Sequence, residues 1–188
     1  MKYVRVVDGL NSNAGNFKFE LNAVNVAKKW DPEETEPEKM GGFNFSTEDK
    51  ILRWLHRGTV LYDVVVPEDA EVVECDSLNC PGGVFRTNKI ILENPRQITD
   101  ELAIELYKKS NLPERSYYQC ICVLLFKKHL EAAKYIVNDK ITKNNIDDAI
   151  VEFEDFIMKK SFDENELWPE AKEIYEMLKT VEVKKMTK

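Results

Sequence analysis

The chain has 188 residues, 43% of them hydrophobic, which is enough to bury an ordinary core as one or two domains. Its formal net charge of -7 is unlike the clustered basic charge of nucleic-acid-binding proteins, so we expect no direct nucleic-acid partner. The longest apolar stretch, residues 120–126, is far shorter than the roughly 20 residues of a membrane span, and no secretory signal begins the chain; we expect a cytoplasmic protein without membrane contact.

The first hundred residues favour strands and turns. Residues Tyr3–Val7 are rich in β-favouring side chains and end at a turn dipeptide, which predicts an N-terminal strand. Apolar side chains recur on one side of a helical projection over residues 21–30, which predicts a helix closed by Pro32. Residues 41–45 predict a short strand whose two phenylalanines share one face.

An acidic loop is predicted between that helix and that strand. Five carboxylates fall within eight residues, namely Asp31, Glu33, Glu34, Glu36 and Glu38, and two prolines interrupt them and prevent a regular helix. Such a surface either provides solubility alone or engages a basic protein that normally binds nucleic acid. Both interpretations stay open.

Ser46, with Asp49 three residues later, is typical of a helix N-cap and predicts a helix from Thr47 to a stop at Gly58. Three strands are predicted after it, at residues 59–66 in the interior of the sheet, 70–75 and 84–92. The N-terminal part therefore reads as a small mixed or antiparallel sheet with two helices.

From Thr99 the apolar period changes from two to about 3.6. Five helices are predicted, in residues 99–110, 117–126, 130–137, 146–157 and 167–178, and the second of these is apolar nearly all round, which places it in the middle of a helical layer. We expect an α+β protein with an α+β domain over residues 1–98 and an all-helical domain over residues 99–188.

The usual catalytic and metal-binding patterns are missing from the sequence. Cys75, Cys80, Cys120 and Cys122 have C-x4-C and C-x-C spacings, which do not fit a four-cysteine zinc site, so we expect reduced thiols and no metal. The two histidines lie in no local catalytic motif, and no G-x-S-x-G, P-loop or G-x-G-x-x-G pattern occurs.

One constellation is more specific. Residues 42–47, the helix predicted after them and the strand at 61–67 resemble the central strand–helix–strand of the ADP-ribosyltransferase fold. Arg5 matches the first-strand arginine of that family's arginine–serine–glutamate class, and Ser46 and Thr47 match its Ser-Thr motif. The resemblance implies an NAD site in which the guanidinium holds a phosphate and the hydroxyls hold the ribose or fix the strand.

The same resemblance implies a catalytic glutamate near the start of a later strand. In the corresponding stretch, residues 83–91, Arg86 and Asn88 occupy the glutamate region, and neither supplies the negative charge that stabilises an oxocarbenium-like centre. Glu93 follows this stretch, and it is the catalytic acid only if the strand is shifted in register relative to the family's strand.

Residues 41–50 and 85–92, together with the helices after them, also resemble uncharacterised proteins of Firmicutes, their phages and giant viruses, which implies an architecture and no activity. We expect a non-enzymatic protein-binding or adaptor protein on a degenerate ADP-ribosyltransferase-like scaffold, without a cofactor, acting through the helices or the acidic loop. The alternatives are an NAD-dependent ADP-ribosyltransferase, and a phage or mobile-element inhibitor of a host defence complex that uses the acidic surface.

Overall fold

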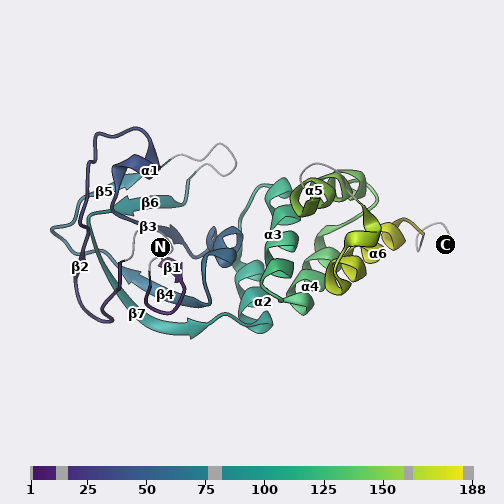
Figure 1. Ribbon diagram of the computed structural model, residues 1–188, viewed down its shortest axis with the longest axis horizontal. Coiled ribbons are helices and arrows are strands. Elements are labelled where there is room, and N and C mark those ends of the chain that lie inside the picture. Colours follow the sequence, from purple (N-terminus) through teal and green to yellow (C-terminus); the bar gives the residue numbers. More distant parts are fainter. Residues whose placement is uncertain (1, 12–16, 76–81, 159–162, 184–188) are drawn as a thin grey trace. The chain divides into compact units, whose positions relative to one another are not determined.

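The computed structural model describes residues 2–11, 17–75, 82–158 and 163–183 (Figure 1). The chain divides into two compact units. The sheet unit comprises Met1–Ile98 with Lys109–Asn111, and the helical unit comprises Thr99–Lys108 with Leu112–Lys188. The expected α+β class is confirmed, with an antiparallel sheet and the helices in the C-terminal part.

The sheet unit is built on seven strands in the described part of the chain. They are β1 (Tyr3–Val7), β2 (Asn25–Val26), β3 (Phe43–Thr47), β4 (Val60–Val65), β5 (Val72–Glu74), β6 (Val84–Thr87) and β7 (Lys89–Gln97). Their spatial order is β2-β7-β4-β1-β3-β6-β5, and each neighbouring pair is antiparallel. The expected interior position of β4 is confirmed, since it lies between β7 and β1.

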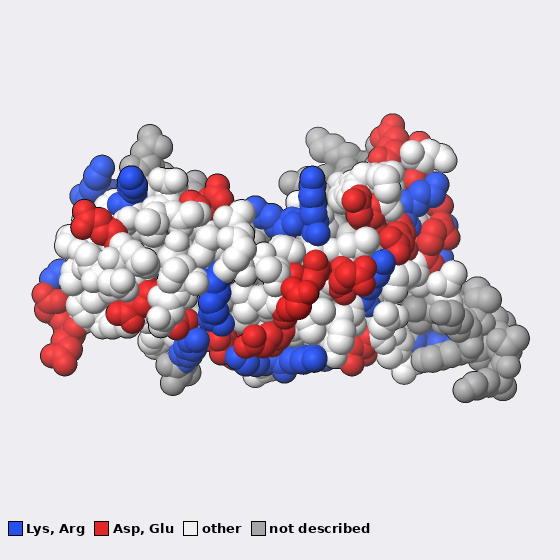
Figure 2. Space-filling model, turned by 90° about the horizontal axis from the view of Figure 1, so that it is seen from below, with Lys and Arg blue, Asp and Glu red and all other residues white. Residues whose placement is uncertain are grey.

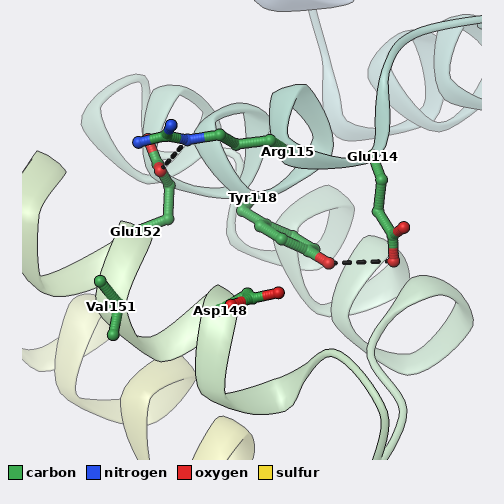
Figure 3. Close-up of a pocket in the computed structure, with 6 residues that line it drawn as sticks. All are labelled: Glu114, Arg115, Tyr118, Asp148, Val151 and Glu152. Carbon is green, nitrogen blue, oxygen red and sulfur yellow. Dashed lines mark hydrogen bonds and ion pairs between the residues drawn. The ribbon is translucent and has the colours of Figure 1, made fainter.

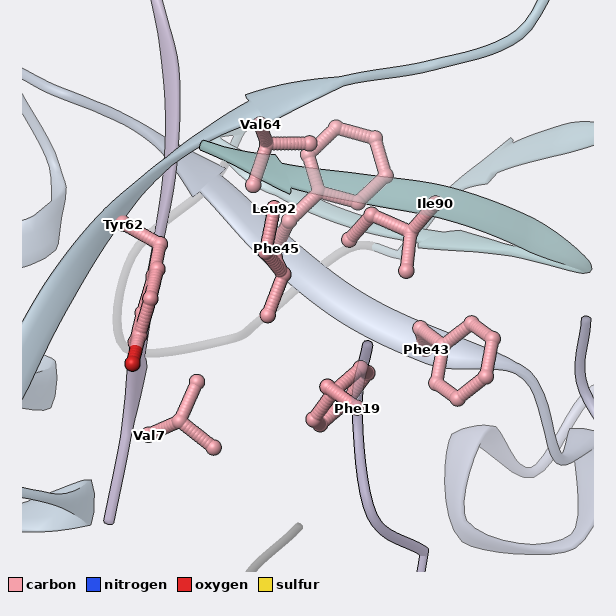
Figure 4. Packing of buried hydrophobic residues seen from close by; sticks show 8 residues of the cluster. All are labelled: Val7, Phe19, Phe43, Phe45, Tyr62, Val64, Ile90 and Leu92. Carbon is pink, nitrogen blue, oxygen red and sulfur yellow. The ribbon is translucent and has the colours of Figure 1, made fainter. Parts of the chain in front are cut away.

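The sheet is strongly bent. Asn88 alone separates β6 from β7 along the chain, whereas β3, β1 and β4 lie between them in the sheet. The bend brings side chains of β3 and β7 into one apolar cluster on what we call the inner face (Figure 4). The buried members of this cluster are Val7, Phe19, Phe43, Phe45, Tyr62, Val64, Ile90 and Leu92.

Alternation of side chains along each strand explains the membership of the cluster. Phe43 and Phe45 are two residues apart on β3 and both are buried in it, which confirms that they share a face. Phe17 and Phe19 pack on Phe43 with ring centroids 4.9 and 5.3 Å away. The preceding loop thus closes the inner face with aromatic contacts.

The other face of the sheet, the outer face, is covered in part by a 3-10 helix, η1 (Ile51–Arg57). Val4 and Val6 point to this face because they alternate with Tyr3, Arg5 and Val7 on β1. The buried side chains of η1 are Ile51, Leu52 and Leu55, and η1 packs on β1.

The predicted helix at residues 21–30 is wrong. This segment forms no helix, and β2 within it pairs with β7. Val24 and Val26 are 52% and 56% exposed, so the apolar stripe that suggested a helix does not face the core. The buried anchor is the Asn25 amide, which accepts from Glu20 N at 2.8 Å and donates to Glu20 O at 2.9 Å. A buried polar side chain that satisfies the local backbone outweighs the helical pattern here.

Ser46 does not cap a helix. It lies within β3, and its hydroxyl donates to the carbonyl of Gly83. The helix that follows begins four residues later than expected, at Ile51, as a 3-10 helix whose N-cap, Lys50, makes no side-chain cap bond.

The strand predicted at 84–92 is in fact two strands, because the chain turns at Asn88. Before the turn β6 pairs with β3, and after it β7 pairs with β4.

The acidic loop contains one short helix, α1 (Pro37–Met40). Both prolines of the loop are expected to prevent a helix, but Pro37 occupies the first turn of α1, where its missing N–H is no loss. Residues 31–36 form no helix or regular strand, as expected.

The helical unit contains α2 (Asp100–Lys109), α3 (Glu114–Phe126), α4 (Leu130–Lys140), α5 (Ile146–Met158) and α6 (Pro169–Val183), with a 3-10 turn, η2 (Glu164–Glu166). The all-apolar α3 lies in the middle of the unit as expected, since it packs against α4, α5 and α6. α3 with α4 and α5 with α6 form two helical hairpins, which stack α3 on α5 and α4 on α6. The Asp100 carboxylate accepts from Ala132 N at 2.8 Å and so caps the first turn of α4.

The inner-face cluster predicts an unequal response to two truncations on neighbouring strands. Leu92→Ala on β7 removes a fully buried side chain and should lower the free energy of unfolding by roughly 2–5 kcal/mol. Val26→Ala on β2 removes an exposed side chain and should cost less than about 1 kcal/mol. Urea denaturation followed by circular dichroism measures both, and equal losses would contradict the assignment of the core.

Candidate functional site

The structure separates the residues that the ADP-ribosyltransferase resemblance would unite. In the pairing of β1 with β3, Tyr3 lies opposite Thr47 and Val4 lies opposite Ser46. Side chains of opposite residues share a face, so Ser46 is on the outer face with Val4. Arg5 and Thr47 lie on the inner face. The arginine and the serine of the expected site therefore project from opposite sides of the sheet.

Arg5 is 8% exposed and its guanidinium is used within the fold. Nη1 donates to the backbone carbonyl and to the side-chain oxygen of Asn44, and the guanidinium stacks over Phe19 at 5.1 Å from the ring centre. Burial, together with the charge of Arg86, lowers the pKa of Arg5 to about 9. Among the described residues no carboxylate pairs with it, and Nε has no hydrogen-bond partner. Arg5 thus ties β1 to β3 from the inside.

Ser46 and Thr47 are also buried. The Ser46 hydroxyl donates to Gly83 O, and a side chain at Gly83 would collide with Lys50 and approach Thr47 Oγ1 to 3.2 Å. Gly83 has a φ of +75°, which a glycine adopts without strain. The hydroxyl of Ser46 therefore holds the chain before β6 closely against β3.

Glu93, the acid of the enzyme alternative, lies on the outer face. It is opposite Asp63 on β4, and Asp63 is opposite Val4 on β1. Glu93 therefore shares a face with Ser46 and is on the other side of the sheet from Arg5. The structure does not bring these three residues together.

Asp63 lies in a network of charges on the outer face. It contacts Lys2 at 3.0 Å and Arg96 at 3.1 Å, and it accepts from Asn94 at 3.1 Å. Glu48 shares Lys2 and Arg96 at 3.5 and 3.6 Å. Burial raises the pKa of Asp63, but the hydrogen bonds and charges of its partners outweigh that effect and hold the pKa below its usual value. These interactions stabilise the sheet unit.

Side chains of the acidic loop make mostly local contacts. Glu33 and Glu36 are exposed, and Glu36 pairs with Lys39 at 2.7 Å. The Glu34 carboxylate accepts from Glu36 N at 3.0 Å. The side chain of Glu38 lies outside the described part of the structure, as does Cys80, while Cys75, Cys120 and Cys122 are buried. On the face shown in Figure 2, basic and acidic side chains are interspersed.

A pocket of about 430 Å³ lies in the helical unit between α3 and α5 (Figure 3). We call it the α3/α5 pocket. Its lining comes equally from the two helices: Glu114, Arg115 and Tyr118 from α3, and Asp148, Val151 and Glu152 from α5. Three carboxylates and one guanidinium give the pocket a net negative charge.

Hydrogen bonds fix most of these side chains. Glu152 is only 7% exposed, and its two oxygens accept from Arg115 Nε at 2.5 Å and Gln119 Nε2 at 2.7 Å. Glu114 accepts from Asn145 Nδ2 at 2.6 Å and Tyr118 OH at 3.0 Å. Glu152 and Glu114 are therefore preorganised around the Tyr118 ring.

The protonation states follow from these contacts. The bonds from Asn145 and Tyr118 lower the pKa of Glu114, so it is ionised at neutral pH. Burial, reinforced by Glu114, raises the pKa of Tyr118, so its hydroxyl stays a neutral donor. Burial and the charge of Glu152 raise the pKa of the Cys122 thiol, so this thiol stays protonated at neutral pH.

The apolar patterns predict a central helix over residues 117–126 and an amphipathic helix over residues 146–157, but they do not predict this pocket. The available signal was the i,i+4 spacing of Glu114 with Tyr118 and of Asp148 with Glu152, which places each pair on one helix face. With 34 acidic residues in the chain, such spacings occur often, and only the packing of α3 on α5 distinguishes this one.

No known family model matches this chain, and no curated protein or solved structure is significantly similar to it. No cluster of His, Cys, Asp and Glu side chains suited to a metal ion occurs in the residues that the structure describes. Within the same residues, no helix has the length and apolar character that crossing a membrane requires.

The network around Asp63 predicts a pH-dependent stability difference. Asp63→Asn should lower the free energy of unfolding at pH 7 by roughly 1 kcal/mol, because it removes the charge shared by Lys2 and Arg96. A lowered pKa means that this stabilisation is present at neutral pH and is lost as the pH falls through that pKa. The difference between the two proteins should therefore shrink below about pH 4.

Urea denaturation at pH 7 and at pH 2.5 measures this effect, with Glu33→Gln in the acidic loop as the control for loss of an exposed carboxylate. A difference that is the same at both pH values would show that the Asp63 charge is not responsible.

Proposed function

We propose that this chain is a non-enzymatic protein-binding or adaptor protein whose helical unit receives a basic side chain of a partner protein. The observation that carries the proposal is the α3/α5 pocket, in which Glu114, Asp148 and Glu152 surround the ring of Tyr118. Its volume of about 430 Å³ lies within the usual range of ligand sites.

The pocket lining suits a lysine or an arginine side chain. Asp148 is exposed, and its charge interacts with that of the neighbouring Arg115 without a direct ion pair among the described residues, so its carboxylate can pair with an incoming cation. The apolar Val151 offers a surface for the methylene stem of such a side chain. Glu114 adds negative potential without needing to reorganise, because hydrogen bonds from Asn145 and Tyr118 already hold it, whereas the charge of Glu152 is paired with Arg115.

The positions of the sheet-unit residues favour binding over ADP-ribose transfer. An NAD site of the kind that the resemblance implies needs its arginine, serine and acid at one ligand. Arg5 is on the inner face, whereas Ser46 and Glu93 are on the outer face. The Arg5 guanidinium also donates to Asn44 instead of pointing to a free phosphate site. The sheet unit therefore serves in this proposal as a scaffold without a cofactor.

Removal of the Asp148 charge tests the proposal. The probe is a set of fluorescently labelled peptides with a single central arginine or lysine in a Gly/Ser/Ala background, matched by peptides with glutamine at that position. The basic peptides should bind the wild-type protein more tightly than the glutamine peptides in fluorescence anisotropy. Asp148→Asn should weaken the basic peptides about fivefold, or ~1 kcal/mol, because it removes one partly exposed ion pair.

Glu33→Gln is the matched control, since it neutralises an exposed carboxylate in the acidic loop. Equal weakening by Glu33→Gln and Asp148→Asn would refute the pocket and favour the alternative of an inhibitor acting through the acidic loop. Titration of the wild-type protein with NAD in a calorimeter should show no heat of binding. Saturable binding of NAD would instead support the ADP-ribosyltransferase alternative.

A further inference from the structure

An aromatic patch lies at the end of α3 that is farther from the α3/α5 pocket. Phe126, the last residue of α3, is 49% exposed. Its ring centroid is 6.1 Å from that of Phe156 on α5 and 5.5 Å from that of Trp168, just before α6. A solvent-exposed phenylalanine that contacts two half-buried rings offers an apolar surface to a binding partner.

The aromatic patch and the pocket lie along one helix–helix seam. Tyr118, Cys122 and Phe126 are spaced by four residues on α3; Tyr118 and Cys122 are buried, and Phe126 continues their row into solvent. On α5, Asp148, Glu152 and Phe156 have the same spacing. Contacts join α3 and α5 near both ends, from the Arg115–Glu152 pair to the Phe126–Phe156 ring contact. Eight residues at 1.5 Å each put the patch about 12 Å from the pocket.

We infer that the binding partner presents an amphipathic helix to this seam, with a basic residue in the α3/α5 pocket and a large apolar residue on the aromatic patch. This inference rests on the proposed function and adds the shape and the second anchor of the ligand. A helical ligand fits the seam because residues seven or eight positions apart lie on one helix face about 12 Å apart. An extended peptide gains affinity by pairing with a sheet edge. The backbones of α3 and α5 are already hydrogen-bonded within their helices, so the seam offers no such edge.

Charge complementarity selects this occupant over a second copy of the chain. A twofold contact would place the same surface on both sides of the interface. With the twofold axis at the pocket, Glu114 and Asp148 of one copy would face the carboxylates of the other, which like-charge repulsion disfavours. A basic segment of a different protein meets the negative end of the seam with opposite charge.

The test uses an alanine-based helical peptide that carries an arginine and, eight positions away, a tryptophan. We call it the two-anchor peptide. The comparison peptides carry the arginine alone, or the same two residues four positions apart. The two-anchor peptide should bind the wild-type protein about tenfold more tightly than the arginine-only peptide, because it buries a large aromatic side chain as well.

Phe126→Ala should remove this tenfold advantage and leave the binding of the arginine-only peptide unchanged. Tyr135→Ala is the matched control, since Tyr135 is a partly exposed aromatic residue on α4, away from the seam. Asp148→Asn should weaken both peptides. Circular dichroism of each variant confirms that the helical unit is folded.

The outcomes separate the two proposals. Equal affinity of the two-anchor and arginine-only peptides, or an unchanged advantage in Phe126→Ala, would overturn this inference and leave the proposed function standing. Tighter binding of the peptide with the closer spacing would also overturn it. Failure of every basic peptide to bind would overturn both proposals. A wild-type dimer in sedimentation velocity that Phe126→Ala dissociates would show that a second copy occupies the patch.

Discussion

Strand β1 lies between β3 and β4, and its register with these neighbours decides which side chains share a face of the sheet. Val4 lies opposite both Ser46 and Asp63, so these residues belong to the outer face with Glu93. Arg5 lies opposite Tyr62 and belongs to the inner face. A shift of one residue would exchange the two sets, and the apolar cluster would then face away from the aromatic loop that closes it.

The bend of the sheet depends on the same register. Ile90 and Leu92 of β7 complete a cluster that Phe43 and Phe45 begin on β3, although β4 and β1 lie between β3 and β7 in the sheet. Polar groups accompany this bend in buried positions: Asn25 holds the loop at β2, and Arg5 spans from β1 to Asn44. Both groups are engaged in the fold, and Arg5 lies on the opposite face of the sheet from Ser46 and Glu93.

The helical unit uses its polar residues differently. Glu152 is buried between α3 and α5 and is compensated by Arg115 and Gln119. The neighbouring Glu114 and Asp148 remain at the surface, where they give the pocket its negative charge. Stacking α3 on α5 thus creates both a core contact and a charged recess, and Phe126 is exposed at the last residue of α3. This combination supports protein binding as the proposed role.

The sequence by itself determined the class of the fold, because the change of apolar period near Thr99 depends only on neighbours along the chain. It also identified β1, the interior position of β4, the shared face of Phe43 and Phe45, and the central position of α3. It misplaced the helix at residues 21–30 and the cap at Ser46, since Asn25 and Ser46 find partners that local patterns do not reveal. Tertiary structure alone decided that Arg5 and Ser46 lie on opposite faces of the sheet and that Glu114 and Asp148 line one pocket. Strand register and helix packing join residues far apart in sequence, so these outcomes depend on contacts that no local pattern contains.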